Sequence, residues 1–333
     1  MERVCIRSIG GYILLIGLLV LGLLGAVVLA VTTGVAGGGL QAVISRTPEP
    51  LWDIIWNMRF PRVVAALLTG ASFALAGAIM QLVTHNPLVD SGLLGINSGA
   101  GLAVAFGAAA GTAHSYRGSM LHAFCGAAIA VFLVIRLGSQ REKQEPALLV
   151  LSGSAIAAFL TAVTQAIALA HGLSKSLSFW TAGSLSGMTW PHVMAVAPWL
   201  CVALLSGCLL APHLSILSLG NEMSRGLGIN LPLIRTLSFI VVFALAGGSV
   251  SLVGGISFIG LIVPHAARFM VGHRPLRFLP VSILLGALLL VLADVAARTV
   301  NAPFDTPVGA LVSLLGVPIF LVLLRRAEGS RTL

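Results

Sequence analysis

The chain has 333 residues, of which 58% are hydrophobic and only 9% are charged, with a formal net charge of +9 and a mean hydropathy of +1.04. A soluble domain carries about a quarter charged residues, so this composition excludes a soluble globular fold. The basic residues are scattered between long apolar runs and form no basic stripe, which argues against a nucleic-acid partner. The composition therefore predicts an all-α integral membrane protein in contact with a lipid bilayer.

The chain begins with a basic segment and then an apolar run. Arg3 and Arg7 precede the run from Gly11 to Val31. A signal peptide has the same order, but this run is longer than a usual signal core and further apolar segments follow it. We expect a retained first transmembrane helix.

Uncharged stretches recur along the rest of the chain, and about 20 apolar residues suffice to span the hydrocarbon core. The stretch from Thr236 to Ala267 is too long for one helix, and Gly254 and Gly255 interrupt it, so we expect two helices there. We predict one transmembrane domain over 1–333 with about ten helices. The expected spans are 11–32, 63–83, 92–111, 118–135, 147–170, 191–211, 233–251, 256–271, 278–297 and 307–324.

The Arg and Lys residues orient these spans. With ten spans and both termini in the cytoplasm, thirteen of the nineteen fall inside, as the positive-inside rule requires. The inside set is Arg3, Arg7, Arg136, Arg141, Lys143, Arg225, Arg235, Arg268, Arg274, Arg277, Arg325, Arg326 and Arg331. The outside set is Arg46, Arg59, Arg62, Arg117, Lys175 and Arg298.

Signatures of catalysis are missing from the sequence. It contains no GxxxxGK[ST] phosphate loop, no HExxH and no GxSxG, and its four cysteines form no CxxC pair, so neither an enzyme nor a metal site is predicted. No ionisable residue falls at the centre of a predicted span, where an ion-coupled carrier usually needs one. Asp294 comes nearest, and we expect it to pair with Arg298 four residues later. The chain therefore shows no energy source of its own.

Four ordered stretches carry a more specific signal. The first is Arg59-Phe60-Pro61-Arg62, and the second is Asn86-Pro87-Leu88 followed by LLGINSGA at 93–100. The third is LSLG at 217–220 with RGLGI at 225–229. The fourth starts with ISFIGLIVPH at 256–265 and continues through Arg268, Leu279-Pro280, Asp294 and Arg298 to PVG at 307–309 and LGVP at 315–318.

Together these stretches resemble the iron-siderophore, haem and vitamin B12 permease family of type II ABC importers, over about residues 50–326. Within the family the chain is most similar to ferric-siderophore permeases such as those for ferric citrate. The resemblance implies a bacterial plasma-membrane subunit that dimerises with a second permease, identical or different. It also implies two cytoplasmic ATPase subunits, which carry the ATP and Mg, and an extracytoplasmic binding protein. No cofactor is expected on this chain.

The resemblance also implies roles for individual residues. Arg59, Arg62 and Arg298 match positions where the family docks acidic residues of the binding protein; snorkelling arginines with Asp294 paired to Arg298 are the alternative. One cytoplasmic gate matches Asn86 and Leu88. The other lies near Pro146 and Ala147, where the vitamin B12 member has small hydroxyl residues and this chain departs from the pattern. The ATPase-coupling loop, about 213–231, contains Leu217, Leu219, Gly220, Glu222, Arg225 and Gly228.

Three functions remain open from the sequence. The first is the permease of an importer for an iron–siderophore complex, with haem or cobalamin as alternative cargo. The second is a self-sufficient carrier driven by an ion gradient, and the third is a receptor-like or channel-like scaffold.

Overall fold

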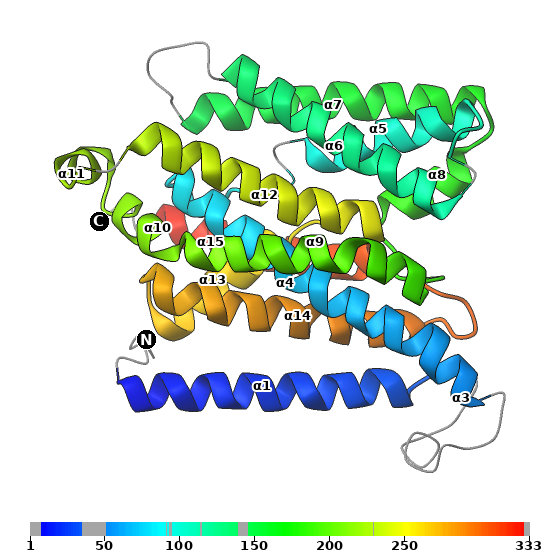
Figure 1. Cartoon of the computed structure of the whole chain (residues 1–333), viewed down its shortest axis with the longest axis horizontal. Helices are drawn as coiled ribbons and strands as arrows, with labels where there is room; N and C mark the ends of the chain where they lie inside the picture. The colour runs from blue at the N-terminus through cyan, green and yellow to red at the C-terminus, as the bar shows by residue number, and fades with distance from the viewer. Residues whose placement is uncertain are drawn as a thin grey trace.

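The computed structural model describes residues 8–34, 51–90, 92, 95–113, 115–138, 146–228 and 230–329, and within these ranges the chain forms helices joined by turns, with no strand. The side chains of 51, 137, 138, 146–150 and 322–329 lie outside this description. The helices lie side by side along one direction (Figure 1). The bundle has an α11 end, which also carries the start of α1, and an α8 end opposite to it. The main helices are α1 (Ile9–Thr32), α4 (Phe60–Val83), α5 (Ile96–Ala109), α6 (Tyr116–Gly138), α7 (Pro146–Ala170), α9 (Trp190–Leu209), α12 (Leu231–Val253), α13 (Ile259–Val271), α14 (Pro275–Thr299) and α15 (Val308–Gly329).

Each of the ten predicted spans overlaps one of these helices. Among the described residues, seven helices are long and apolar enough to cross a membrane, and three shorter apolar helices accompany them, at Ile96–Ala109, Ile259–Val271 and Val308–Leu321. The predicted division of the long uncharged stretch is confirmed, because α12 ends at Val253 and α13 begins at Ile259. Gly254 ends α12 with a φ of 75°, a left-handed conformation that glycine adopts without steric cost.

The second span begins earlier than the sequence predicts. Helix α3 (Leu51–Ile54), a π-helical turn η1 (Ile55–Arg59) and α4 form one continuous rod, and the apolar segment starts at Trp52. The expected start at 63 is therefore wrong. Dividing the sequence at charged residues removed this first part, whereas Arg59 and Arg62 lie within the rod, where Arg59 donates to backbone carbonyls and Arg62 pairs with aspartates.

Helix α4 is the most buried helix of the bundle and packs against α9, α12, α13 and α14. Two glycine pairs allow this close approach. A Cβ atom at Gly77 would overlap the backbone of Gly260 on α13, and one at Gly70 would overlap the backbone of Gly286 on α14. Small residues at such crossings let transmembrane helices pack backbone to backbone. Gly70 and Gly77 thus let α4 pack closely against α14 and α13 at the centre of the fold.

The segment between α4 and α5 folds back into the bundle. An Asp90 carboxylate oxygen accepts a hydrogen bond from the backbone amide of Phe258 at 3.3 Å, at the start of α13, and a Cβ at Gly260 would overlap the same carboxylate. Gly260 in turn touches Gly77, which lies six residues before the end of α4, or roughly 9 Å along the helix. Asp90 therefore lies inside the bundle although it falls between two predicted spans, a placement that the sequence did not indicate.

Candidate functional site

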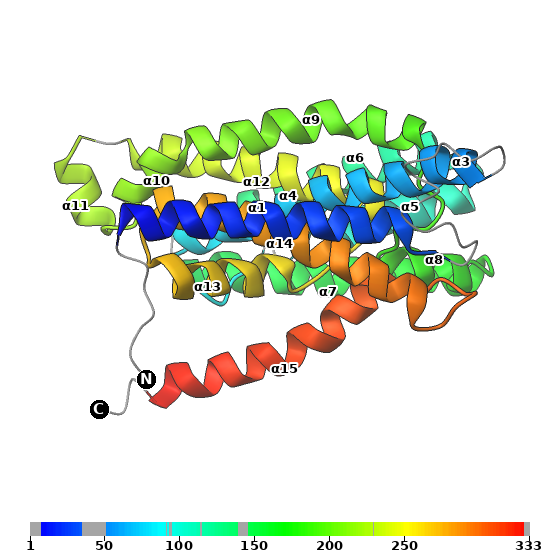
Figure 2. The ribbon, with the colours of Figure 1, turned by 90° about the horizontal axis from the view of Figure 1, so that it is seen from below.

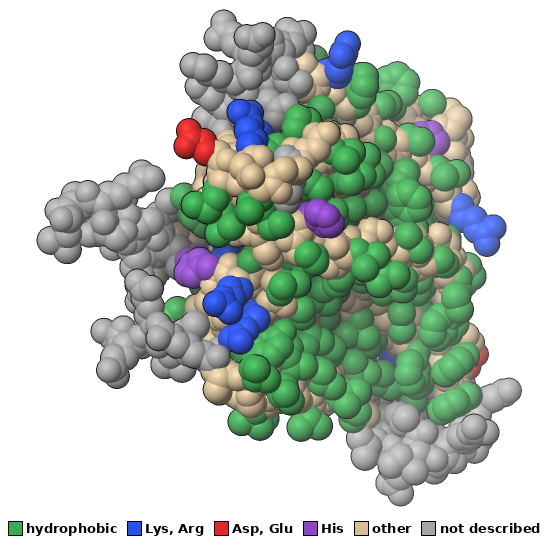
Figure 3. All heavy atoms as spheres, turned by 60° about the vertical axis from the view of Figure 1, so that its left-hand side comes forward, with side chains coloured by type: hydrophobic (Ala, Val, Ile, Leu, Met, Phe, Trp, Pro, Cys, Tyr) green, Lys and Arg blue, Asp and Glu red, His purple; other side chains and the backbone are tan. Residues whose placement is uncertain are grey.

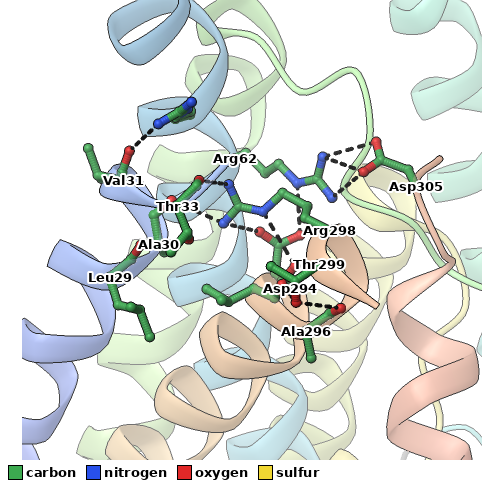
Figure 4. Close-up of polar contacts among 12 residues, drawn as sticks. Leu29, Ala30, Val31, Thr33, Arg62, Asp294, Ala296, Arg298, Thr299 and Asp305 are labelled. Atoms are coloured by element: carbon green, nitrogen blue, oxygen red, sulfur yellow. Dashed lines mark hydrogen bonds and ion pairs between the residues drawn. The ribbon is translucent and has the colours of Figure 1, made fainter. Parts of the chain in front are cut away.

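Three arginines and two aspartates gather at the α8 end of the bundle (Figure 4). Arg59 comes from η1, Arg62 from the first turn of α4, and Asp294 and Arg298 from the last turns of α14. Asp305 lies in the turn between α14 and α15. Three segments of the chain, the α3–η1–α4 rod, the end of α14 and the turn after it, thus place five charged side chains at one position.

Asp294 is the centre of this cluster. Its Oδ1 accepts a hydrogen bond from Nε of Arg62 at 2.8 Å, and its Oδ2 lies 3.1 Å from Nη2 of Arg298. The predicted pairing of Asp294 with Arg298 is confirmed. The pairing with Arg62 was not predicted, because the two residues are 232 positions apart. The Asp294 side chain is 1% exposed, so two arginines compensate one buried negative charge.

Arg59 and Arg298 also bind the C-terminal end of α1. Nη1 of Arg59 donates to the carbonyl oxygen of Val31 at 2.9 Å, and Nη2 of Arg298 donates to that of Ala30 at 3.1 Å (Figure 4). The last carbonyls of a helix lack intrahelical partners and carry the negative end of its dipole, so cations are favourable there. This cluster therefore fastens α1, α4 and α14 together.

Asp305 connects the cluster to the loop before α9. Its Oδ2 lies 3.1 Å from Nη1 of Arg62 and accepts a hydrogen bond from Oγ of Ser186 at 2.6 Å. Burial alone would raise the pKa of Asp305, but these hydrogen bonds and the charges of Arg62 and Arg298 outweigh it and lower the pKa. Asp305 is therefore ionised at neutral pH. Nothing in the sequence around Asp305 and Ser186 indicates that they meet Arg62.

The three arginines do not form an open surface patch. Arg59 is 5% exposed, and the side chains of Arg62 and Arg298 are 11% and 10% exposed. Together with Met58, Asp305 and neighbouring residues they line a cavity of about 300 Å³. A partner's side chain would have to enter this cavity to reach a guanidinium, and the docking role itself stays a prediction.

The predicted coupling loop forms two short helices at the opposite end. These are α10 (Ala211–Leu217) and α11 (Asn221–Gly226), and α11 projects from the bundle (Figure 1). Gly220 precedes α11 with a φ of 103°, and Gly228 follows it with a φ of 77°. Gly220 and Gly228 thus mark the two ends of this short helix, as glycines with a positive φ commonly do.

The exposed surface of this loop is apolar. Leu219, Met223 and Leu227 are each more than half exposed, whereas Leu217 is fully buried. Leu217 therefore packs inside the protein, and the ATPase-coupling role of this loop stays a prediction. Sequence reasoning missed Met223 and Leu227, although their spacing of four residues would place them on one helix face.

Polar contacts hold α11 in place. Oγ of Ser224 donates to the carbonyl oxygen of Ile216 at 2.9 Å, and Nη2 of Arg235 donates to Oδ1 of Asn221 at 2.9 Å. Glu222 and Arg225, the polar contacts expected for a partner, are both exposed. The loop thus presents exposed leucine, methionine and charged side chains on helices that these hydrogen bonds hold in place.

The predicted gate is described only in part. Oδ1 of Asn86 accepts a hydrogen bond from the backbone amide of Leu88 at 3.0 Å, and both side chains are half-buried. This Asx turn is the turn that Asn-Pro favours. Pro146 and Ala147 begin α7, but their side chains lie outside the described residues. The gating role of these four residues therefore stays a prediction.

Comparison with known proteins gives consistent matches along almost the whole chain. The sequence model of the FecCD transport family matches residues 13–326. The chain is 40% identical over 326 residues to the iron(3+)-hydroxamate import system permease protein FhuB of Bacillus subtilis strain 168, covering 96% of this chain and 85% of that protein. It is also 40% identical over 284 residues to the Fe(3+) dicitrate transport system permease protein FecC of Escherichia coli strain K12, covering 84% and 85%.

A solved structure has the same architecture. An ABC transporter described as of the metal-chelate type, in an inward-facing conformation, superimposes with a TM-score of 0.83 at 25% identity. The match covers 94% of this chain and 99% of that one. The order and packing of the ten helices are therefore those of a known transporter fold.

Proposed function

The chain belongs to the FecCD transport family, and we propose that it is the membrane-spanning permease subunit of an ATP-driven ABC importer for an iron–siderophore complex. The family match over 13–326 carries this proposal. Two relatives that cover most of the chain are named for iron(3+)-hydroxamate and Fe(3+) dicitrate, so an iron chelate is the cargo that the comparisons favour. Haem and cobalamin are the alternative cargoes.

We place the α11 end in the cytoplasm, with both termini on that side. Among the described residues, this end carries Arg136, Arg225 and Arg274, and the positive-inside rule assigns such loops to the cytoplasm. The exposed surface of Leu219, Met223 and Leu227 then faces a cytoplasmic ATPase subunit. Two such subunits supply ATP hydrolysis with their own ATP and Mg.

A second permease subunit covers the side of the bundle from which α15 diverges. Figure 2 shows α15 leaning away from the other helices toward the α11 end. Its Leu314, Leu315 and Leu321 are more than half exposed, as is Phe159 on α7. A second copy of this chain or a related permease would bury these side chains and enclose the pathway. Asn86 and Leu88, with Pro146 and Ala147, would close that pathway on the cytoplasmic side.

An extracytoplasmic binding protein docks at the α8 end through acidic side chains. A carboxylate that enters the cavity beside Arg59, Arg62 and Arg298 meets three guanidinium groups, and Asp305 is the most exposed of the acids that already occupy the cluster, at 33%. The incoming carboxylate would compete with Asp305 for Arg62. Docking would then release the turn before α15 from α4. Binding-protein docking would in this way be linked to α15, the helix at the proposed permease interface.

Reconstitution tests the function directly. The complete importer, with this chain, its partner permease, the ATPases and the binding protein, is placed in liposomes with radioactive ferric hydroxamate, ferric citrate, haem or cobalamin outside. We expect ATP-dependent accumulation of one of the ferric chelates. Accumulation of haem or cobalamin alone would instead identify the alternative cargo.

A carrier driven by an ion gradient is the second candidate, and Asp90 inside the bundle is the observation that favours it. However, the Asp90 carboxylate accepts a hydrogen bond from the Phe258 amide at the N-terminus of α13, where the helix dipole favours a negative charge, so a structural role accounts for it. Liposomes that contain this chain alone, under a proton or sodium gradient, should show no uptake. Uptake under those conditions would overturn the importer proposal.

A further inference from the structure

A large cavity opens at the α11 end, beside α10 and the ends of α4 and α13. Its volume is about 990 Å³, which is the size of a small-molecule site. Blue and purple side chains gather toward the left of Figure 3, where this end comes forward, while the flank of the bundle is green. Among the described lining residues, four side chains are basic or histidine and none is acidic. They are His85, His265, Arg268 and His273.

Arg268 is held in the wall of this cavity by neutral groups. Its Nη1 donates to Oε1 of Gln81 at 2.5 Å, and its guanidinium lies 4.6 Å from the centre of the Phe278 ring. Gln81 cannot turn away, because its Nε2 donates to the carbonyl oxygen of Gly260 at 3.0 Å. These contacts orient the guanidinium but leave its charge uncompensated.

The contrast with the α8 end is direct. There the fold gives the buried Arg62 and Arg298 two aspartates, whereas no described carboxylate lies within ion-pair distance of the part-buried Arg268. A partly desolvated charge is costly without a counter-charge. The histidines of the cavity do not mark a metal site, because no group of three or more His, Cys, Asp or Glu that could hold a metal occurs among the described residues.

We infer that this cavity binds a small oxyanion, a carboxylate- or phosphate-bearing molecule, with Arg268 as the principal ligand. The histidines supply further N–H donors around the same space. His85 and Pro87 line the cavity on either side of the gate residue Asn86, so the anion would lie at the proposed cytoplasmic mouth of the importer. The inference rests on the proposed function only for this position relative to the membrane.

Equilibrium binding to the full chain in nanodiscs of zwitterionic lipid tests the site, with citrate and inorganic phosphate as the probes. We expect saturable binding of at least one probe, weakened about tenfold or more in Arg268→Gln, since a charge-assisted hydrogen bond is lost. Arg268→Lys should retain part of it. Arg136→Gln is the matched control, because Arg136 is an exposed arginine at the same end and outside the cavity.

Further variants and lipids identify the source of the anion. Should Arg268→Gln fail to fold, His273→Glu at the exposed rim introduces a repelling charge without touching Gln81 or Phe278, and it should weaken binding as well. The binding assay is then repeated in nanodiscs of acidic phospholipid. If the probes no longer bind there, and if a lipid co-purifies with the wild type but not with Arg268→Gln, the natural anion is a lipid headgroup.

Three results would overturn the inference. These are no binding at millimolar probe, equal binding by wild type and Arg268→Gln, and loss of binding once the two ATPase subunits are attached, which would mean that the partner fills the cavity. Because these assays measure binding, they are separate from uptake. An importer without the anion site would still accumulate chelate, and a site without importer activity would still bind citrate or phosphate.

Discussion

Arg62 on α4 and Asp294 on α14 form an ion pair of 2.8 Å between Nε and Oδ1, although 232 positions separate them in the chain. Asp294 also pairs with Arg298, and both arginines are largely buried. The carboxylate of Asp294 thus compensates charge from two helices at once. This relationship holds the α8 end together, beside the cavity where a docking partner's carboxylate would compete with Asp305 for Arg62.

Removal of the Asp294 carboxylate should destabilise the protein strongly. In Asp294→Asn, Arg62 keeps only Asp305 and Arg298 loses its ion pair while remaining buried. Breaking a buried pair by removing one partner costs about 3–5 kcal/mol. Thermal unfolding of the purified chain in detergent measures the effect. Asp53→Asn, an exposed carboxylate at the same end, should change little, and equal stability of the two variants would contradict the structural role of the cluster.

Docking of the binding protein should respond in opposite directions to two changes in the cluster. Arg59→Gln removes a guanidinium from the cavity and should weaken docking about tenfold. Asp305→Asn removes the acid that competes for Arg62 and should strengthen docking. Surface plasmon resonance on the permease in nanodiscs gives both affinities, with Arg117→Gln, exposed at the same end, as the control. Unchanged docking in both variants would remove this cluster from the interface.

Acid should selectively remove the contribution of Asp305. Its pKa in the folded protein is lowered, so the ionised form stabilises the fold at pH values above the ordinary 3.8. This stabilisation is lost as the pH falls below 3.8 through the lowered folded pKa. Wild type should therefore be more stable than Asp305→Asn at neutral pH, and the two should converge in acid. Unfolding temperatures measured across the pH range check this, and a constant difference would contradict it.

Two residues of the coupling loop should have different roles: Leu217 should stabilise the fold, and Met223 should contact the ATPase. Leu217→Ala removes a fully buried side chain and should cost about 2–5 kcal/mol of stability. Met223→Glu places a charge on an exposed side chain and should leave stability unchanged while abolishing co-purification of the ATPase subunits. Thermal unfolding and subunit pull-down on both variants distinguish the roles. A Met223→Glu variant that still retains the ATPases would show that this surface is not their contact.

The glycine crossing of α4 should not tolerate a methyl group. In Gly77→Ala the new Cβ overlaps the backbone of Gly260, which cannot move without displacing α13. Overpacking of this kind costs about 1–3 kcal/mol or more. Gly22→Ala on α1 is the control, because nothing lies within 4 Å of a Cβ there. Folded yield and unfolding temperature report the difference, and equal behaviour of both variants would show that α4 and α13 can separate at low cost.

The positions of the helices and of their breaks were predictable from the sequence, because both depend on local properties. A run of apolar residues long enough to cross a bilayer is a property of consecutive residues, and so is the glycine pair that divides α12 from α13. The pairing of Asp294 with Arg298 is local too, since residues four apart share a helix face. The helix ends at Gly220 and Gly228 follow from the same kind of signal.

Relationships between distant segments were decided only by the tertiary structure. Charge alone could not show that Arg62 meets Asp294 and Asp305, so the sequence placed Arg62 outside the span that contains it. That Leu217 is buried while Met223 is exposed is likewise a property of packing. Asp90 is carried into the bundle by the fold of its loop. Helices form from neighbours in the chain, but the partner of a side chain depends on which helices pack together.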